Sequence, residues 1–277
     1  MADLKGDMEA EYNNRARVPE HPQLIAEWQS SAQAYRAACA NAQLDLGYGA
    51  DSRQIFDIFP KVAETGEQPR TAVFIHGGYW QALDKSFFSH MAKGLNAHGY
   101  DVVIANYRLC PQVAIADIIE DMRDLAARVY DLLRKPLLVY GHSAGGHLAA
   151  ALMATDWAER GLPATLCDRA MPISGLFDLV PLVETSVNNA LNMSEASARQ
   201  AAPLDNSPPA AGRFIAVVGG AESDEYLRQS RTLVERWSGP NLSGVLDIQE
   251  GANHFTVINP LADPVSALTT ALAELGA

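Results

Sequence analysis

The segment from Gly141 to Gly145 carries the clearest chemical signal in the sequence. It reads Gly-His-Ser-Ala-Gly, follows the apolar run Leu137–Tyr140 and precedes the helix-prone stretch Leu148–Trp157. A serine in a G-x-S-x-G turn between a strand and a helix has a sharp, strained backbone that exposes its hydroxyl, so small residues must flank it. The sequence therefore predicts Ser143 as a nucleophile, with the amide of Ala144 as a donor to a developing oxyanion.

A second glycine-containing segment, His76-Gly77-Gly78-Tyr79-Trp80, follows the apolar run Thr71–Ile75. Glycine lets the backbone approach a ligand closely, and amide donors aimed at a negative oxygen are worth a large factor in rate. We expect the amides of Gly77 and Gly78 to complete an oxyanion hole, with Tyr79 as a further option. His76 is interpreted as a structural loop residue rather than a base.

An acid and a base follow Ser143 along the chain. The order nucleophile, acid, histidine is the one used by hydrolases whose serine lies in a G-x-S-x-G turn between a strand and a helix. The predicted strand Phe214–Val218 leads into a loop with two candidate carboxylates, of which Glu222 is the first choice and Asp224 the alternative. His254 lies on a loop after a late strand and is the expected base, which takes the serine proton and returns it to the leaving group.

The other six histidines fit this scheme less well. His142 and His147 flank the nucleophile and either line the pocket or brace it. The remaining ones lie in helical, surface-like or loop stretches and are His21, His76, His90 and His98.

Other chemistries lack their signatures. The sequence contains no HExxH motif, no tight His/Asp cluster and no phosphate-binding GxxxxGK[ST] loop, so we expect no metal and no cofactor. Cys39, Cys110 and Cys167 are odd in number and widely spaced, which predicts free thiols in or near the core.

The composition limits the kinds of partner that the protein is expected to bind. A formal net charge of −12 disfavours binding to nucleic acid, a polyanion. No run approaches the roughly 18 apolar residues of a membrane span, and the first twenty residues lack the apolar core of a secretory signal. We expect a soluble, cytoplasmic protein that takes a small-molecule ester or amide. The assembly is left open, with a homodimer as one alternative.

The elements that must position these residues alternate between apolar strands and helices. We predict strands at Arg53–Phe59, Thr71–Ile75, Asp101–Asn106, Leu137–Tyr140, Ala170–Ile173, Phe214–Val218 and Val245–Gln249. We predict helices at Lys85–His98, Ile115–Leu133, Leu148–Trp157, Tyr226–Trp237 and Asp263–Leu275. This alternation indicates βαβ units, a mostly parallel sheet flanked by helices and hence an α/β class protein.

Two regions fall outside that alternation, within what we expect to be a single domain over residues 1–277. Residues 1–50 are predicted to be helical, and the spacing of Leu24, Ile25, Trp28 and Tyr35 favours a docking helix with a buried stripe. A roof over one side of the active site is the functional alternative. Residues 175–209 are predicted to form a small cap insertion, helical over 184–200. A polar loop is expected over 61–70.

Several runs together resemble kynurenine formamidase of the serine-hydrolase type, also called arylformamidase. They are HGGYWQ at 76–81, GHSAGGHLAA at 141–150, TDW at 155–157, NYRLCP at 106–111 and EYLRQS at 225–230. The wider relatives are esterases that resemble hormone-sensitive lipase and share the HGG motif. The resemblance implies the α/β-hydrolase fold, with Ser143 as nucleophile and His254 as base. Gly77, Gly78 and Ala144 would supply the oxyanion amides.

The resemblance departs at the acid, because the family usually has Asp where this sequence has Glu222, which keeps Asp224 open. It implies cleavage of an aryl formamide to an amine and formate. Aromatic side chains near the motifs are candidate substrate contacts, with core packing as the alternative for each: Tyr79, Trp80, Phe177 and Phe255. The rival functions are a general short-chain carboxylesterase and a non-catalytic binding protein on the same scaffold.

Overall fold

The computed structural model describes residues 7–62, 66, 68 and 70–277, so part of the loop expected over 61–70 lies outside the described residues. One eight-stranded sheet has the order β1-β2-β4-β3-β5-β6-β7-β8. The strands are β1 Gln43–Gly47, β2 Ile55–Phe59, β3 Thr71–Ile75, β4 Val102–Ala105, β5 Leu137–His142, β6 Arg169–Ile173, β7 Gly212–Gly219 and β8 Leu242–Gln249. Only the pairs β1–β2 and β2–β4 are antiparallel, which confirms the predicted mostly parallel sheet.

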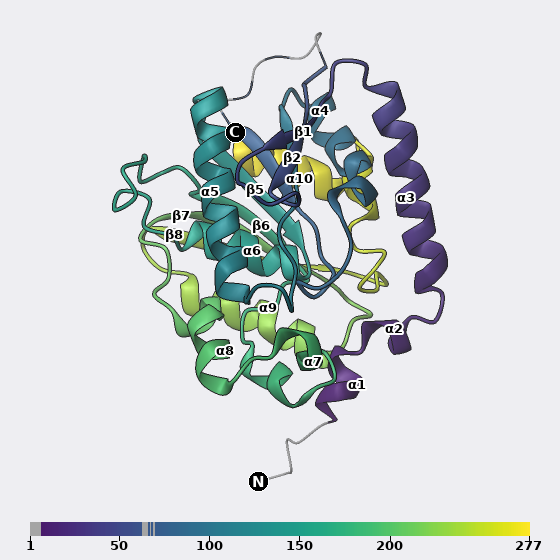
Figure 1. Cartoon of the computed structure of the whole chain (residues 1–277), viewed down its shortest axis with the longest axis vertical. Helices are drawn as coiled ribbons and strands as arrows, with labels where there is room; N and C mark the ends of the chain where they lie inside the picture. The colour runs from purple at the N-terminus through teal and green to yellow at the C-terminus, as the bar shows by residue number, and fades with distance from the viewer. Residues whose placement is uncertain (1–6, 63–65, 67, 69) are drawn as a thin grey trace.

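The central strands are continuous apolar runs because helices cover both faces of the sheet. In β3, Val73 and Ile75 pack into one core cluster while Ala72 and Phe74 pack into the other. The first cluster includes residues of α5 (Ile115–Leu133), α6 (Ala144–Met153) and α9 (Asp224–Trp237). The second includes residues of α3 (His21–Ala38), α4 (Lys93–Ala97) and α10 (Ala267–Gly276). Figure 1 shows α3 running along one side of the molecule.

Three predicted helices shift at their ends, and the smallest shift is that of α9, which begins at Asp224 instead of Tyr226. The helix expected at 148–157 begins at Ala144, directly after Ser143, and ends at Met153. The helix expected at 263–275 begins at Ala267, where Ser266 caps it, and is preceded by a short 3₁₀ turn over Asn259–Ala262. α5 has the predicted bounds. The early start of α6 puts the first amide of the helix, that of Ala144, directly after Ser143.

The single helix expected over 85–98 is wrong. The segment forms two 3₁₀ turns, Lys85–Phe87 and Ser89–Ala92, followed by the short helix α4. Phe88 leaves the helical conformation at φ −126° and its buried ring lies 5.4 Å from Trp28 and 5.7 Å from Phe74, centroid to centroid. Burying this aromatic ring interrupts the helix.

Residues 1–50 are only partly helical, as far as they are described. They contain α1 (Met8–Tyr12), α2 (Asn14–Arg17) and α3, and then the edge strand β1, which sequence analysis missed. β1 pairs antiparallel with β2 and is largely exposed. Its two leucines, Leu44 and Leu46, alternate with polar residues, but so short a run does not stand out from the helix-prone segment before it.

The cap region is broken into short pieces rather than one helix over 184–200. They are the 3₁₀ turns Val180–Glu184 and Pro203–Asp205 and the helices α7 (Asn188–Leu191) and α8 (Glu195–Ala201). Asn192 ends α7 in the left-handed conformation, and the Ser194 hydroxyl caps α8. Figure 1 shows α1, α7 and α8 gathered at one end of the molecule.

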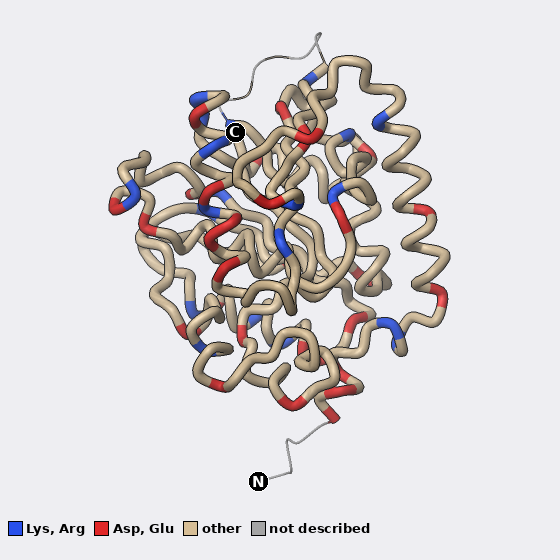
Figure 2. Tube along the Cα trace, in the orientation of Figure 1, with Lys and Arg blue, Asp and Glu red and all other residues tan. Residues whose placement is uncertain are grey.

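Charged residues of both signs are interspersed along the described trace (Figure 2). Among the described residues, no helix is long and apolar enough to span a membrane.

Candidate active site

Ser143 lies on a strained turn between β5 and α6. Its backbone has φ 57° and ψ −118°, a conformation that L-residues rarely adopt. A Cβ atom at Gly141 would lie 2.3 Å from the Gly145 carbonyl oxygen, and one at Gly145 would lie 2.0 Å from the carbonyl oxygen of Ile75. The turn therefore closes only with glycine at both positions, as the motif predicts.

The structure brings Ser143, His254 and Glu222 into one hydrogen-bonded chain. Ser143 Oγ lies 3.0 Å from His254 Nε2, and His254 Nδ1 lies 2.6 Å from Glu222 Oε2. All three residues are buried. A carboxylate on Nδ1 keeps the proton there and leaves Nε2 free to accept the serine proton.

The Glu222 carboxylate is fixed by further donors. Its Oε1 accepts hydrogen bonds from the Gly219 amide at 2.8 Å and from the Ser174 hydroxyl. Asp224 instead is exposed at the first position of α9. Between the two carboxylates that the sequence left open, the geometry favours Glu222.

The sequence left two roles open for His142, lining the pocket or bracing the residues around it, and the structure shows both. It lines the cavity over Ser143, and its Nε2 donates to the His254 carbonyl oxygen at 2.8 Å. Burial lowers the pKa of His142 well below its ordinary value, so the ring is neutral. The bond fixes the backbone of the proposed base.

The glycine loop, residues 76–84, follows β3. The amides of Gly77, Gly78, Tyr79 and Ala144 have no acceptor among the described residues of the protein. A Cβ at Gly77 would lie 3.0 Å from Ser143 Cβ, and Gly78 has φ +114° with the Ala82 carbonyl oxygen 2.2 Å from an added Cβ. Glycine is required at both positions, and these free donors lie next to the serine.

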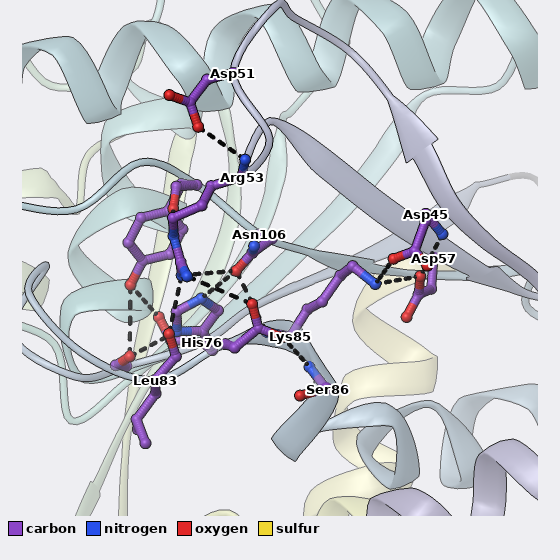
Figure 3. A network of polar contacts seen from close by, with 12 residues as sticks. Asp45, Asp51, Arg53, Asp57, His76, Leu83, Lys85, Ser86 and Asn106 are labelled. Atoms are coloured by element: carbon purple, nitrogen blue, oxygen red, sulfur yellow. Dashed lines mark hydrogen bonds and ion pairs between the residues drawn. The ribbon is translucent and has the colours of Figure 1, made fainter.

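A polar network, buried at His76, Asp57 and Lys85, anchors the glycine loop (Figure 3). Arg53 donates to the carbonyl oxygens of Leu83 and Tyr107, both at 2.9 Å, and to Asn106 Oδ1 at 3.1 Å. Lys85 Nζ lies 2.6 Å from Asp57 Oδ1 and 2.7 Å from Asp45 Oδ1. We call these residues, together with His76, the anchoring network.

Sequence analysis missed the anchoring network apart from the structural interpretation of His76. The His76 ring is fully buried and stacked on Tyr107 at 4.4 Å, and burial lowers its pKa to about 4. One signal could have revealed the rest: Asp57 is a charged residue inside the apolar strand sequence Ile-Phe-Asp-Ile-Phe. Such a residue needs a buried partner, because an isolated buried charge is very costly.

A cavity of about 400 Å³ opens over Ser143. It is lined near Ser143 by Gly78, Tyr79, His142, His254 and Phe255, and the N-terminal helices supply a second wall. That wall consists of Glu9, Tyr12, Asn13, Asn14, Arg15, Ile25 and Trp28. Both readings of the N-terminal segment therefore apply, since α3 buries Trp28 while α1 and α2 roof the site.

Of the four aromatic residues suggested as substrate contacts, only Tyr79 and Phe255 line this cavity. Trp80 and Phe177 are fully buried in the core. Trp80 Nε1 donates to His147 Nδ1 at 3.3 Å, and His147 Nε2 donates to the Ala201 carbonyl oxygen at 2.8 Å. Through His147, Trp80 connects α6 to the end of α8 in the cap, and its ring lies in the core rather than at the cavity.

No group of three or more His, Cys, Asp or Glu side chains in the described part of the chain is arranged to hold a metal ion. Cys39, Cys110 and Cys167 are free thiols, as the sequence predicts.

The sheet order and the helices on both faces define this protein as an α/β-hydrolase. The family model for BD-FAE matches residues 56–209, and the chain belongs to that family.

Curated relatives agree with the resemblance to kynurenine formamidase. The kynurenine formamidase of Salmo salar is 29% identical over 244 residues, which are 85% of this chain and 82% of that protein. The kynurenine formamidase of Danio rerio is 28% identical over 247 residues, 84% of this chain and 81% of that protein. The predicted resemblance is confirmed, and the chain is a hydrolase.

Solved structures give the same fold. A "putative thioesterase" from Silicibacter sp. TM1040 is 34% identical with a TM-score of 0.85, and the match covers 96% of this chain and 98% of that one. An esterase from Pyrobaculum calidifontis is 17% identical with a TM-score of 0.69, covers 92% of each chain and bears on the fold alone.

Proposed function

We propose that this protein is a serine hydrolase that cleaves a small aryl formamide or ester through an acyl-enzyme. The observation that carries the proposal is the chain of contacts from Ser143 Oγ to His254 Nε2 at 3.0 Å and from His254 Nδ1 to Glu222 at 2.6 Å. A serine becomes a useful nucleophile when an adjacent base, itself oriented by a third group, removes its proton.

In the first half of the reaction, His254 takes the Ser143 proton as Oγ bonds to the substrate carbonyl carbon. The electron pair of the C=O bond moves to the carbonyl oxygen, where amides of the glycine loop and Ala144 stabilise it. His254 then gives the proton to the leaving group. Water repeats the sequence on the acyl-enzyme and releases the acid.

The cavity supports an aryl leaving group. Trp28 and Phe255 lie 5.9 Å apart, centroid to centroid, and both line the cavity with Tyr79. Aromatic side chains in the wall of a cavity suit an aromatic ring. The kynurenine formamidase relatives favour the amide between a formyl group and an aryl amine as the bond that is cleaved.

Labelling with a fluorophosphonate tests the nucleophile. We expect one modification per chain at Ser143, absent in Ser143→Ala. Lack of labelling in folded wild-type protein would contradict the proposal and favour a non-catalytic binding protein.

A comparison of substrates tests the class of bond. We expect turnover of N-formyl-kynurenine with a kcat/KM at least comparable to that for p-nitrophenyl acetate. Cleavage of the ester with only background cleavage of the formamide would assign the protein as a general carboxylesterase with the same triad.

A further inference from the structure

The glycine loop turns through three consecutive residues with positive φ. They are Gly78 at 114°, Tyr79 at 50° and Trp80 at 56°. Glycine adopts such angles freely, but a bulky residue rarely does, and it keeps them only where the surrounding contacts hold it. The position of the free amides beside Ser143 therefore depends on the contacts that fix Tyr79 and Trp80.

Trp80 and Tyr79 are fixed in different ways. The Trp80 carbonyl oxygen accepts a hydrogen bond from the Cys110 amide at 2.8 Å, and the Trp80 ring is fully buried. The backbone of Tyr79, in contrast, makes no hydrogen bond with any described residue. The polar contacts that Tyr79 does make are those of its hydroxyl. This hydroxyl is thus the polar attachment of a strained residue that also lines the cavity.

The Tyr79 hydroxyl uses its full hydrogen-bonding capacity of one donor and two acceptor positions. It donates its proton to the Tyr12 carbonyl oxygen at 2.5 Å, because a carbonyl oxygen can only accept. It therefore accepts in its contact with the Tyr226 hydroxyl at 2.8 Å, and it also accepts from Asn14 Nδ2 at 3.3 Å. The same Asn14 amide donates to the Tyr226 oxygen at 2.8 Å. The N-terminal helices, the glycine loop and α9 meet at this one hydroxyl.

The partners of the Tyr79 hydroxyl are themselves held in place. Tyr12, Asn14 and Tyr226 are buried. The Tyr12 hydroxyl donates to Glu225 Oε2 at 2.6 Å and accepts from Gln229 Nε2 at 2.7 Å, and both of these residues lie on α9. The roof of the cavity and α9 therefore form one support, to which the hydroxyl attaches the glycine loop.

We propose that Tyr79 is a positioning residue for the oxyanion hole. Its hydroxyl attaches the strained turn of the glycine loop to the N-terminal helices and α9, and this attachment keeps the free amides of Gly77, Gly78 and Tyr79 in place beside Ser143. The inference rests on the proposed role of Ser143 as nucleophile. Amide donors stabilise an oxyanion best when they are preorganised, because a loop that must reorder during the reaction loses part of the effect.

The attachment acts on both halves of the reaction, because an oxyanion forms in each. During acylation Ser143 Oγ bonds to the substrate carbonyl carbon, and during deacylation a water oxygen bonds to the carbonyl carbon of the acyl-enzyme. Each time His254 takes the proton of the attacking group and the C=O electron pair moves to the carbonyl oxygen, while Tyr79 keeps its own proton. A direct contact between Tyr79 and the leaving group would act on acylation alone, since the acyl-enzyme has lost that group.

Burst kinetics with p-nitrophenyl acetate on Tyr79→Phe test the proposal. Phenylalanine keeps an aromatic ring in the cavity wall and removes only the hydroxyl. We expect acylation and deacylation each to slow by about 10- to 100-fold, less than the roughly 100- to 1,000-fold loss for an oxyanion donor removed outright. The affinity for substrate should change little. Deacylation of Tyr79→Phe at the wild-type rate would overturn the inference and assign Tyr79 to leaving-group binding.

The carbonyl stretching band of the acetyl-enzyme gives a readout that a merely structural role would not move. Hydrogen bonds from oxyanion amides polarise the C=O bond and lower its frequency. We expect infrared difference spectra with an isotope-labelled acetyl group to place this band at higher frequency in Tyr79→Phe than in the wild type. Slow deacylation with the wild-type band would also overturn the inference, because the effect would not pass through the amides.

Tyr100→Phe is the matched control. Tyr100 is a fully buried tyrosine whose hydroxyl donates to the Ala273 carbonyl oxygen at 2.7 Å, so the variant loses an equivalent bond outside the site. We expect its rates and its carbonyl band to equal those of the wild type.

A second variant serves if Tyr79→Phe does not fold. Asn14→Leu is similar in size and removes the hydrogen bonds that Asn14 donates to the Tyr79 and Tyr226 hydroxyls. We expect deacylation to slow by about 3- to 10-fold, the effect of one ordinary hydrogen bond, with the same direction of band shift. The wild-type rate and band in this variant would overturn the inference.

Fluorophosphonate labelling separates the failure of this inference from that of the proposed function. Folded wild-type protein that does not react would overturn Ser143 as nucleophile and the role of Tyr79 with it. Wild-type reaction together with unchanged kinetics of Tyr79→Phe would overturn the role of Tyr79 alone.

Discussion

Two polar networks lie beside the glycine loop, and they use similar residue types for different functions. The proposed triad of Ser143, His254 and Glu222 joins neutral and charged groups in a line that ends at the cavity. The anchoring network pairs Lys85 with Asp57 and lies beneath the loop without lining that cavity. The first network can pass a proton to a substrate, while the second holds the backbone that the first acts beside.

The difference lies in where charge can move. In the triad, a proton transferred to His254 creates a positive ring next to a carboxylate that is already held by Gly219 and Ser174. In the anchoring network, Lys85 compensates the buried charge of Asp57, and removal of Lys85 would leave Asp57 as an unpaired buried charge. We therefore expect the triad to govern rate and the anchoring network to govern stability.

Replacement of the proposed nucleophile should give the largest effect. We expect Ser143→Ala to lower kcat by at least about 10⁴-fold, because the hydroxyl that forms the acyl-enzyme is gone. The free energy of unfolding should stay near the wild-type value, since the side chain bears no stabilising charge. Steady-state kinetics and urea denaturation measure the two quantities. Residual activity within tenfold of the wild type would contradict the assignment.

Glu222→Gln should follow, with kcat reduced by about 10³- to 10⁴-fold and KM little changed. An amide at this position favours the wrong tautomer of His254 and does not stabilise its protonated form. Steady-state kinetics measure the loss. Asp224→Asn is the matched control, because Asp224 is exposed, and should behave as the wild type. The reverse pattern would assign the acid to Asp224.

Lys85→Met tests the other side of the comparison. It leaves Asp57 buried without its cation, and we expect the free energy of unfolding to fall by about 3–5 kcal/mol. The kcat of the folded protein should change by less than tenfold, as measured on samples whose folded fraction is known from circular dichroism. In Lys85→Met/Asp57→Leu, much of the stability should return, because no buried charge remains.

A loss of rate without loss of stability in Lys85→Met would remove the distinction between the two networks. It would mean that the cation acts on the reaction rather than on the anchoring of the loop.

The two networks also differ in how far sequence could predict them. Ser143, Glu222 and His254 lie at positions fixed by strand ends and chain order, and the structure brings the three together. Asp57 and Lys85 are 28 residues apart with no motif between them. Their pairing depends on the strand order β2-β4-β3 and on an interrupted helix, neither of which a local pattern encodes.

The roof of the cavity was only partly predictable for a similar reason. Helical spacing identified the stripe with Trp28, but the contacts of Asn14 and Tyr12 with α9 join residues more than 200 positions apart. Trp80 and Phe177 were suggested as substrate contacts because they lie near motifs in sequence. A neighbouring residue in a turn or loop points elsewhere, and both rings fill the core instead.

Acid should weaken both networks together, because each contains a buried neutral imidazole: His142 beside the triad and His76 under the glycine loop. Burial lowers the pKa of His76 to about 4, and that of His90, outside both networks, to about 4 as well. The pKa of histidine in the unfolded chain is about 6.5. Between these values the unfolded chain binds more protons than the folded one, so the free energy of unfolding falls as the pH drops from 6.5 to about 4.

At pH 5.5 the loss should be about 1 kcal/mol for each such histidine. Urea denaturation at pH 7.5, 6.5 and 5.5 measures it in the wild type and in His90→Gln. The variant lacks one titrating ring and should lose about 1 kcal/mol less over this range, while His76 and His142 still titrate. An equal loss in both proteins would show that His90 is protonated in the folded state, and a flat profile would mean that neither network depends on a neutral imidazole.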